Sequence, residues 1–189
     1  MEERLTGNER RFALRKRTQT AHERLDAVVG GFDTIDDYRR YLIGLSAFRA
    51  AMDGALRRVA WPAGWSWRPT ALARSLAGDA IDLGLPAIQQ IRCDMDLNDR
   101  SVLLGALYVL EGSTLGARLL RQRAAKIGLD EDFGARHLAT MSNDIAHWHS
   151  FLVLLDETAD FDVERAAATA NAVFALAIQC FESELLFVQ

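Results

Sequence analysis

The chain has 189 residues, of which 50% are hydrophobic and 25% charged. This length suits one domain with a sizeable core, so we expect a single domain over residues 1–189. The net charge of -4 and the pI near 5.6 exclude the basic surface of a nucleic-acid-binding domain. The sequence contains no continuous apolar run of about 18 residues and no hydrophobic signal region at its start, so we expect a cytoplasmic protein without membrane contact.

Apolar residues recur at three-and-four spacing, prolines are rare and β-branched runs are scarce, which predicts an all-α fold. The first predicted helix covers residues 9–29 and ends at the Gly30-Gly31 pair. The second begins after Thr34 or Asp36 and continues to Leu56. The tryptophan-rich segment 61–69 is predicted to be a loop, which either packs onto the core or forms a partner surface.

The second half of the chain is predicted to contain both short and long helices. Short helices are expected at residues 70–77 and 86–92. A long helix should begin at Asn98 or Asp99 and continue to about Ile127, just before Gly128. The remaining apolar patterns predict helices over residues 141–156 and 163–187. Cys93 and Cys180 lack the spacing of a zinc site or a disulfide framework.

The long helix carries glycines in its middle, within the segment from Tyr108 to Leu120. Gly112 and Gly116 are i and i+4, and Ser113 and Ala117 form the adjoining row, so the four positions make a patch about 6 Å long. Each interior glycine costs about 1 kcal/mol relative to alanine. A helix with such a patch bends there, allows another helix to approach closely, or holds a flat ligand against its backbone. The spacing alone leaves all three possibilities open.

His22 is the histidine best placed for chemistry. It adjoins the apolar stripe of the first helix, so we expect its imidazole to point into the core, bound to a carbonyl, a carboxylate or a metal ion. Arg15 lies seven residues earlier, about 10 Å away along the helix axis. The basic run around Arg15 is either a solvated face or a binding site for an anion. Together with the glycine patch, these residues would suit a planar macrocycle that carries a metal and carboxylates.

Two other groups of polar residues are predicted to have no catalytic role. Glu111 adjoins the glycine patch, and it is either a solvated carboxylate, which we favour, or paired with a cation on another helix. His147 and His149 are i and i+2, so they point to different sides of a helix and do not share a metal ion.

Three segments resemble the heme oxygenase superfamily, particularly its bacterial members, including those found alongside bacterial phytochromes. The segment from Leu14 to His22 resembles the family's proximal helix, which implies that His22 ligates the heme iron. The segment from Tyr108 to Gly116 resembles the distal helix, which kinks over heme at its glycines. The segment from Ala170 to Glu182 resembles the last helix, with its spaced aromatic residues. The resemblance implies a single-domain helical bundle with a glycine-kinked distal helix.

The resemblance also implies a function: oxidative cleavage of heme, as substrate and cofactor, to biliverdin, Fe²⁺ and CO with O₂ and reducing electrons. Gly112, Ser113 and Gly116 would form the catalytic distal wall, Ala117 would adjoin it, and Arg15 would bind the propionates. The implied partners are heme, an electron donor (a ferredoxin, a flavodoxin or a reductase) and a bacterial phytochrome that accepts biliverdin. The alternatives are a non-catalytic heme-binding sensor or carrier, and a heme-free helical interaction module.

Overall fold

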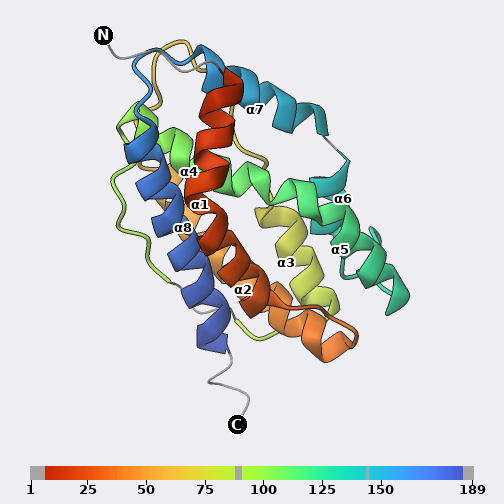
Figure 1. Ribbon diagram of the computed structural model, residues 1–189. Helices are drawn as coiled ribbons and strands as arrows, with labels where there is room; N and C mark the ends of the chain where they lie inside the picture. The colour runs from red at the N-terminus through yellow and green to blue at the C-terminus, as the bar shows by residue number, and fades with distance from the viewer. Residues whose placement is uncertain (1–6, 88–90, 144, 185–189) are drawn as a thin grey trace.

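The computed structural model describes residues 7–87, 91–143 and 145–184, which contain eight helices and no β-strand (Figure 1). This architecture confirms the predicted all-α fold. The helices are α1 (Gly7–Val29), α2 (Ile35–Leu56), α3 (Ala73–Asp82), α4 (Arg100–Gly112), α5 (Thr114–Lys126), α6 (Arg136–Ser142), α7 (Ile145–Glu157) and α8 (Val163–Glu184).

The first two helices begin and end at the predicted signals. Helix α1 ends at Val29, and Gly30 follows with φ of +64°, a conformation that glycine adopts without strain. Thr34 caps α2, because its Oγ1 accepts a hydrogen bond from the Asp37 amide at 3.2 Å. The Asp37 carboxylate accepts the Thr34 amide in return, also at 3.2 Å, which completes a capping box.

Two of the later predictions are wrong in position or type. The helix expected at 70–77 begins at Ala73 and continues to Asp82. The helix expected at 86–92 does not form at residues 86–87 or 91–92, while residues 88–90 lie outside the described residues. Gly84 has φ of +62°, and Pro86 disfavours helical backbone in the residue before it, so the chain leaves helical conformation there.

Two predicted boundaries differ for other reasons. The helix expected at 141–156 is two helices, because α6 ends at Ser142 and α7 begins at Ile145, with residue 144 outside the described residues. The predicted end of the last helix, residues 185–187, also lies outside them.

Helix α8 lies at the centre of the packing and contacts α1, α2 and α4 (Figure 1). Two glycines allow these close contacts. A Cβ atom added to Gly105 would lie 2.1 Å from the Ala166 carbonyl oxygen, and one added to Gly44 would lie 2.5 Å from the Phe181 ring. Helices α4 and α8 therefore touch through their backbones at Gly105, a position that the sequence prediction did not single out.

The stretch Arg100–Lys126 is long and apolar enough, by length and composition, to span a membrane. Half of its apolar window is buried inside the protein, and a break at Ser113 divides it into α4 and α5. The most deeply buried apolar residues of α4 form part of the core: Leu103, Leu104, Leu107 and Leu110. The apolar character of this stretch is therefore explained by its place in the core.

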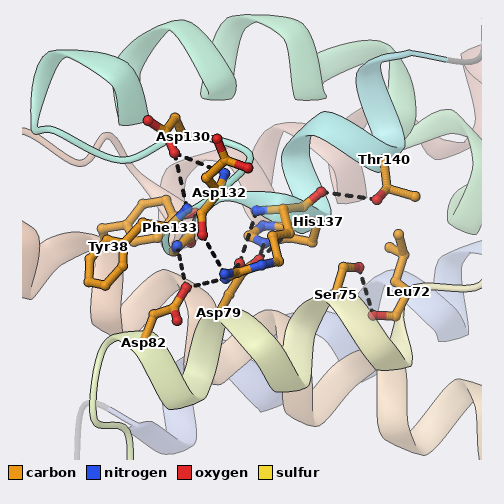
Figure 2. A network of polar contacts seen from close by, with 12 residues as sticks. Tyr38, Leu72, Ser75, Asp79, Asp82, Asp130, Asp132, Phe133, His137 and Thr140 are labelled. Carbon is orange, nitrogen blue, oxygen red and sulfur yellow. Dashed lines mark hydrogen bonds and ion pairs between the residues drawn. The ribbon is translucent and has the colours of Figure 1, made fainter.

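A buried polar network attaches α6 to α3 (Figure 2). Asp79 of α3 is fully buried, and its carboxylate accepts the backbone amides of Arg136 at 2.9 Å and His137 at 3.0 Å. These amides belong to the first turn of α6, so Asp79 caps α6 from a neighbouring helix. Its second oxygen also lies 2.7 Å from Nδ1 of His137, which is fully buried as well. Helix α6 in turn packs on α5.

Candidate functional site

The predicted kink lies at Ser113, between the end of α4 at Gly112 and the start of α5 at Thr114. Hydroxyl groups bind the carbonyl oxygens at the break. Ser113 Oγ donates to the Leu110 carbonyl at 2.6 Å, and Thr114 Oγ1 donates to the Glu111 carbonyl at 2.6 Å. Side-chain bonds of this kind bend helices, and a neighbouring glycine makes the bend easier. The kink is therefore a product of this local sequence.

The glycines at the kink face open space. A Cβ atom added to Gly116 would meet no other atom within 4 Å, and one added to Gly112 would meet only Trp148 Cζ3, at 4.0 Å. Both results contrast with Gly105, where the backbone of α8 occupies the space. No described helix of this chain uses the room at Gly112 and Gly116, so close packing within the fold does not account for them.

The exposed part of the patch is smaller than the sequence predicted. Ser113 and Gly116 are exposed and Gly112 is half-buried. Ala117, in contrast, is fully buried, because it lies on the side of α5 that faces the core. The expectation that Ala117 adds open surface to the patch is wrong, and the bare surface consists of Gly112, Ser113 and Gly116.

His22 does not point into the core as expected. Its side chain is 60% exposed, and its Nδ1 lies 2.9 Å from Oδ2 of Asp26, one turn later in α1. The ring also makes an edge contact with Phe174 of α8, with 5.7 Å between the ring centroids. The histidine that is buried in the core is His137. His22 lies at the edge of the apolar stripe, so a small rotation around the helix axis moves it from the predicted interior to the surface.

The contact with Asp26 would leave the second ring nitrogen of His22 free for a ligand. When Nδ1 donates its proton to the carboxylate, Nε2 keeps its lone pair, which is the arrangement of metal-binding histidines with a second carboxylate partner. The i,i+4 spacing from His22 to Asp26 was visible in the sequence, although it was not used in the prediction.

Arg15 of α1 lies close enough to Tyr108 of α4 for its charge to act on the Tyr108 hydroxyl. In Figure 1, α1 crosses in front of α4. Burial raises the pKa of Tyr108 on α4, whereas the positive charges of Arg11 and Arg15 and a hydrogen bond with Thr18 lower it. These effects require the basic face of α1 to lie near the Tyr108 hydroxyl. Arg15 itself is exposed, so its charge remains available to an anion.

These residues fit a metal-bearing macrocycle better than a bare metal ion. Within the described part of the chain, no group of three or more His, Cys, Asp or Glu side chains could hold a metal ion. An iron atom at His22 Nε2 would therefore need other ligands, and a porphyrin supplies four nitrogen atoms. Exposed apolar side chains on α1 and α5 could cover its faces: Phe12 is 69%, Leu115 48% and Leu119 54% exposed.

Glu111 is not the solvated carboxylate that we expected. It is fully buried, and Thr70 donates to it through both its amide, at 2.9 Å, and its hydroxyl, at 3.2 Å. Glu111 is buried because the loop before α3 covers this side of α4. No local sequence pattern indicates where that loop lies. His147 lies 3.7 Å from Glu111 and His149 is exposed, in agreement with the prediction that the two histidines point apart.

The tryptophan-rich loop packs onto the protein. Trp61, Trp65 and Trp67 are all partly buried against the core. Trp67 also stacks on His147, with 4.8 Å between the ring centroids, and donates from Nε1 to Ser150 Oγ at 3.0 Å. These contacts support the first of the two interpretations, in which the loop is anchored to the core.

Comparisons with known proteins agree with this site. A model of the heme oxygenase family matches residues 11–183. The chain is 35% identical over 151 residues to heme oxygenase PigA of Pseudomonas aeruginosa, covering 74% of this chain and 73% of the relative. Its structure resembles the NO- and CO-bound heme oxygenase of Neisseria meningitidis, with a TM-score of 0.72, 26% sequence identity, and coverage of 96% of this chain and 92% of the other.

The family match includes the helix that carries His22, the kink at Ser113 and most of α8. The comparisons favour the enzyme over the two alternatives, a non-catalytic heme sensor or carrier and a heme-free interaction module. The chain therefore belongs to the heme oxygenase family, and it is a heme-degrading enzyme with heme as its substrate and O₂ as its co-substrate.

Proposed function

We propose that the chain binds heme between the exposed face of α1 and the kink at Ser113, with His22 as the iron ligand and Gly112, Ser113 and Gly116 as the distal wall. Bound heme supplies the iron that activates O₂ and the macrocycle that is opened to biliverdin, Fe²⁺ and CO. The observation that carries the proposal is the open space at Gly116 and Gly112, which none of the described helices fills.

His22 has two tasks in this arrangement. Its Nε2 would hold the iron, and its Nδ1 proton would remain with Asp26, which orients the ring and raises the basicity of the ligating nitrogen. Bound heme would also cover the imidazole, which is 60% exposed without it.

The distal residues would leave room for a small molecule and for water. A side chain at Gly116 or Gly112 would project into the open space next to the kink. Ser113 Oγ already donates its proton to the Leu110 carbonyl, so its lone pairs are free to accept a hydrogen bond from water. The distal wall would therefore offer an acceptor for ordered water, which can deliver protons to the reacting oxygen.

Arg15 would bind a heme propionate, and its proximity to Tyr108 on α4 supports this role. Ala117 is fully buried beneath the wall, so its methyl group would not contact heme. It would limit the depth of the pocket through the packing of α5.

A separate protein would deliver the reducing electrons: a ferredoxin, a flavodoxin or a reductase. Cys93 and Cys180 are both buried, and they form no disulfide within the described residues. These donors are cytoplasmic carriers, and we place the reaction in the cytoplasm. The resemblance to members found beside bacterial phytochromes supports a phytochrome as the biliverdin acceptor.

One experiment tests the proposed site. Hemin is added to the protein, the Soret band is recorded, and ascorbate or a reductase is then supplied while biliverdin absorption is followed. We expect His22→Ala to change the ferric spectrum and abolish turnover, because it would remove the side chain that holds the iron. His149→Ala, which changes an exposed histidine on α7, is the matched control and should behave as the wild type. An unchanged ferric spectrum in His22→Ala would refute the ligand assignment. Heme binding without heme loss under reductant would favour a sensor or carrier.

A further inference from the structure

Glu111 has more buried hydrogen bonds than an ordinary helix residue. It is fully buried, both of its carboxylate oxygens accept from Thr70, and His147 Nε2 lies 3.7 Å away. A buried carboxylate is costly unless charges and hydrogen bonds compensate it. A buried carboxylate whose hydrogen bonds are all satisfied makes the structure around it more rigid.

Thr70 is held from two sides. Glu111 accepts from its amide and hydroxyl, while Arg49 of α2 donates to its carbonyl at 2.6 Å. Arg49 is itself only 3% exposed, and burial lowers its pKa while the negative charges of Asp53 and Glu111 raise it. Thr70 lies in the loop before α3, and it is thus clamped between Arg49 of α2 and Glu111 of α4.

The same carboxylate lies next to the kink. Glu111 precedes Gly112 directly, and its own carbonyl accepts from Thr114 Oγ1 at 2.6 Å, across the break at Ser113. A glycine and a helix break both loosen a backbone, so we expect this turn to open more readily than the middle of α4 or α5. Thr70 therefore holds, through the Glu111 side chain, the last turn of α4 before the distal wall.

We propose that Glu111 is a positioning residue for heme cleavage: anchored by Thr70, it fixes the end of α4 so that Gly112 and Ser113 keep a constant height above the heme. This inference rests on the proposed distal wall. A shift of about 1 Å in a group that positions a reacting atom can lower a rate about 100-fold. We therefore expect the loss of the clamp to lower kcat and to change heme affinity little.

The first test needs no heme. Amide hydrogen exchange is measured in the heme-free protein carrying Glu111→Ala, Glu111→Gln or Thr70→Val. Glu111→Ala should speed exchange at residues 112–116 about tenfold or more, which corresponds to a loss of about 1.4 kcal/mol of local stability. Glu111→Gln keeps an acceptor for the Thr70 amide and should stay within about threefold of the wild type. Thr70→Val removes only the hydroxyl and should fall between the two.

Asp79→Asn is the matched control, because it also alters a fully buried carboxylate, at the α3–α6 junction. It should lower global stability without a selective effect at residues 112–116. Wild-type exchange at the kink in Glu111→Ala would overturn the proposal, and so would an equal increase throughout α4 and α8. If Glu111→Ala does not fold, Thr70→Val decides: no selective increase at residues 112–116 would overturn the proposal.

The second test uses the heme-loaded enzyme. Glu111→Ala should lower kcat by about 10-fold to 100-fold while the heme Kd changes by less than about threefold, and Glu111→Gln should restore most of kcat. A larger loss of affinity than of kcat would overturn the positioning role. The two proposals can be refuted separately. An unchanged ferric spectrum in His22→Ala refutes the proposed heme site, whereas wild-type hydrogen exchange in Glu111→Ala refutes the role of Glu111.

Discussion

Gly116→Ala and Gly105→Ala add the same methyl group to the α4–α5 stretch, yet the structure predicts opposite effects on the free energy of unfolding. At Gly116 the methyl group meets no atom within 4 Å. Alanine is the better helix former there, so we expect a gain of about 0.5–1 kcal/mol. At Gly105 the methyl group would lie 2.1 Å from the Ala166 carbonyl oxygen, so α4 and α8 must separate. Overpacking of this kind costs about 1–3 kcal/mol, and we expect a net loss of about 2 kcal/mol.

Urea unfolding of the heme-free protein measures both effects. With a slope of about 2 kcal/mol per molar urea, the midpoint should rise by about 0.3–0.5 M in Gly116→Ala and fall by about 1 M in Gly105→Ala. The same Gly116→Ala protein should degrade heme more slowly, because its added methyl group projects from the proposed distal wall. A destabilised Gly116→Ala variant would show that Gly116 serves packing, and a neutral Gly105→Ala would show that α4 and α8 do not touch there. Either result refutes the distinction between the two glycines.

Three further predictions concern stability and turnover. Arg10 is 3% exposed and caps the end of α7, because its guanidinium donates to the carbonyls of Leu155, Asp156 and Thr158. Arg10→Met should therefore lower the free energy of unfolding by about 3 kcal/mol. Urea titration measures this loss, and an unchanged midpoint would contradict the capping role. Ser113→Ala should lower the rate of biliverdin formation about tenfold, or 1.4 kcal/mol, if its hydroxyl accepts from water, and a wild-type rate would exclude that role. Hydrogen bonds lower the pKa of four carboxyl groups in the folded state: Asp37, Asp82, Glu131 and Glu164. Their contribution to the free energy of unfolding is present above the unfolded pKa values of 3.8 and 4.5, and it is lost as the pH falls through the lowered pKa values. The Tm should therefore fall below pH 4.5, and a flat Tm from pH 6 to 3 would contradict this.

Local signals predicted the elements whose ends depend on local chemistry. Gly30 ends α1 because a glycine tolerates positive φ, and Thr34 begins α2 because a threonine and an aspartate three residues later form a capping box. The glycine spacing left a bend, a close helix contact and a flat ligand open, and the family resemblance implied the kink that lies at Ser113. The helix expected at 86–92 is wrong in its described residues, because spacing alone cannot weigh the effects of Gly84 and Pro86 on the backbone.

The errors at the site come from long-range packing. Whether His22 is buried depends on how α1 is rotated against α8, and whether Glu111 is solvated depends on where the loop with Thr70 lies. Gly105 carries the same local signal as Gly116, yet α8 covers one and leaves the other open. Residue spacing identified His22 as a candidate and places Asp26 at i+4, and the folded helix shows that the two side chains are in contact.

The central claim is that His22 ligates the iron opposite the wall formed by Gly112, Ser113 and Gly116. Resonance Raman spectroscopy of the ferrous heme complex tests it most directly, because the vibration between iron and an imidazole nitrogen reports the ligand itself. We predict this vibration in the wild type and in the His149→Ala control, and its absence in His22→Ala. An iron–imidazole vibration that persists unchanged in His22→Ala would contradict the account, since another histidine would then hold the iron.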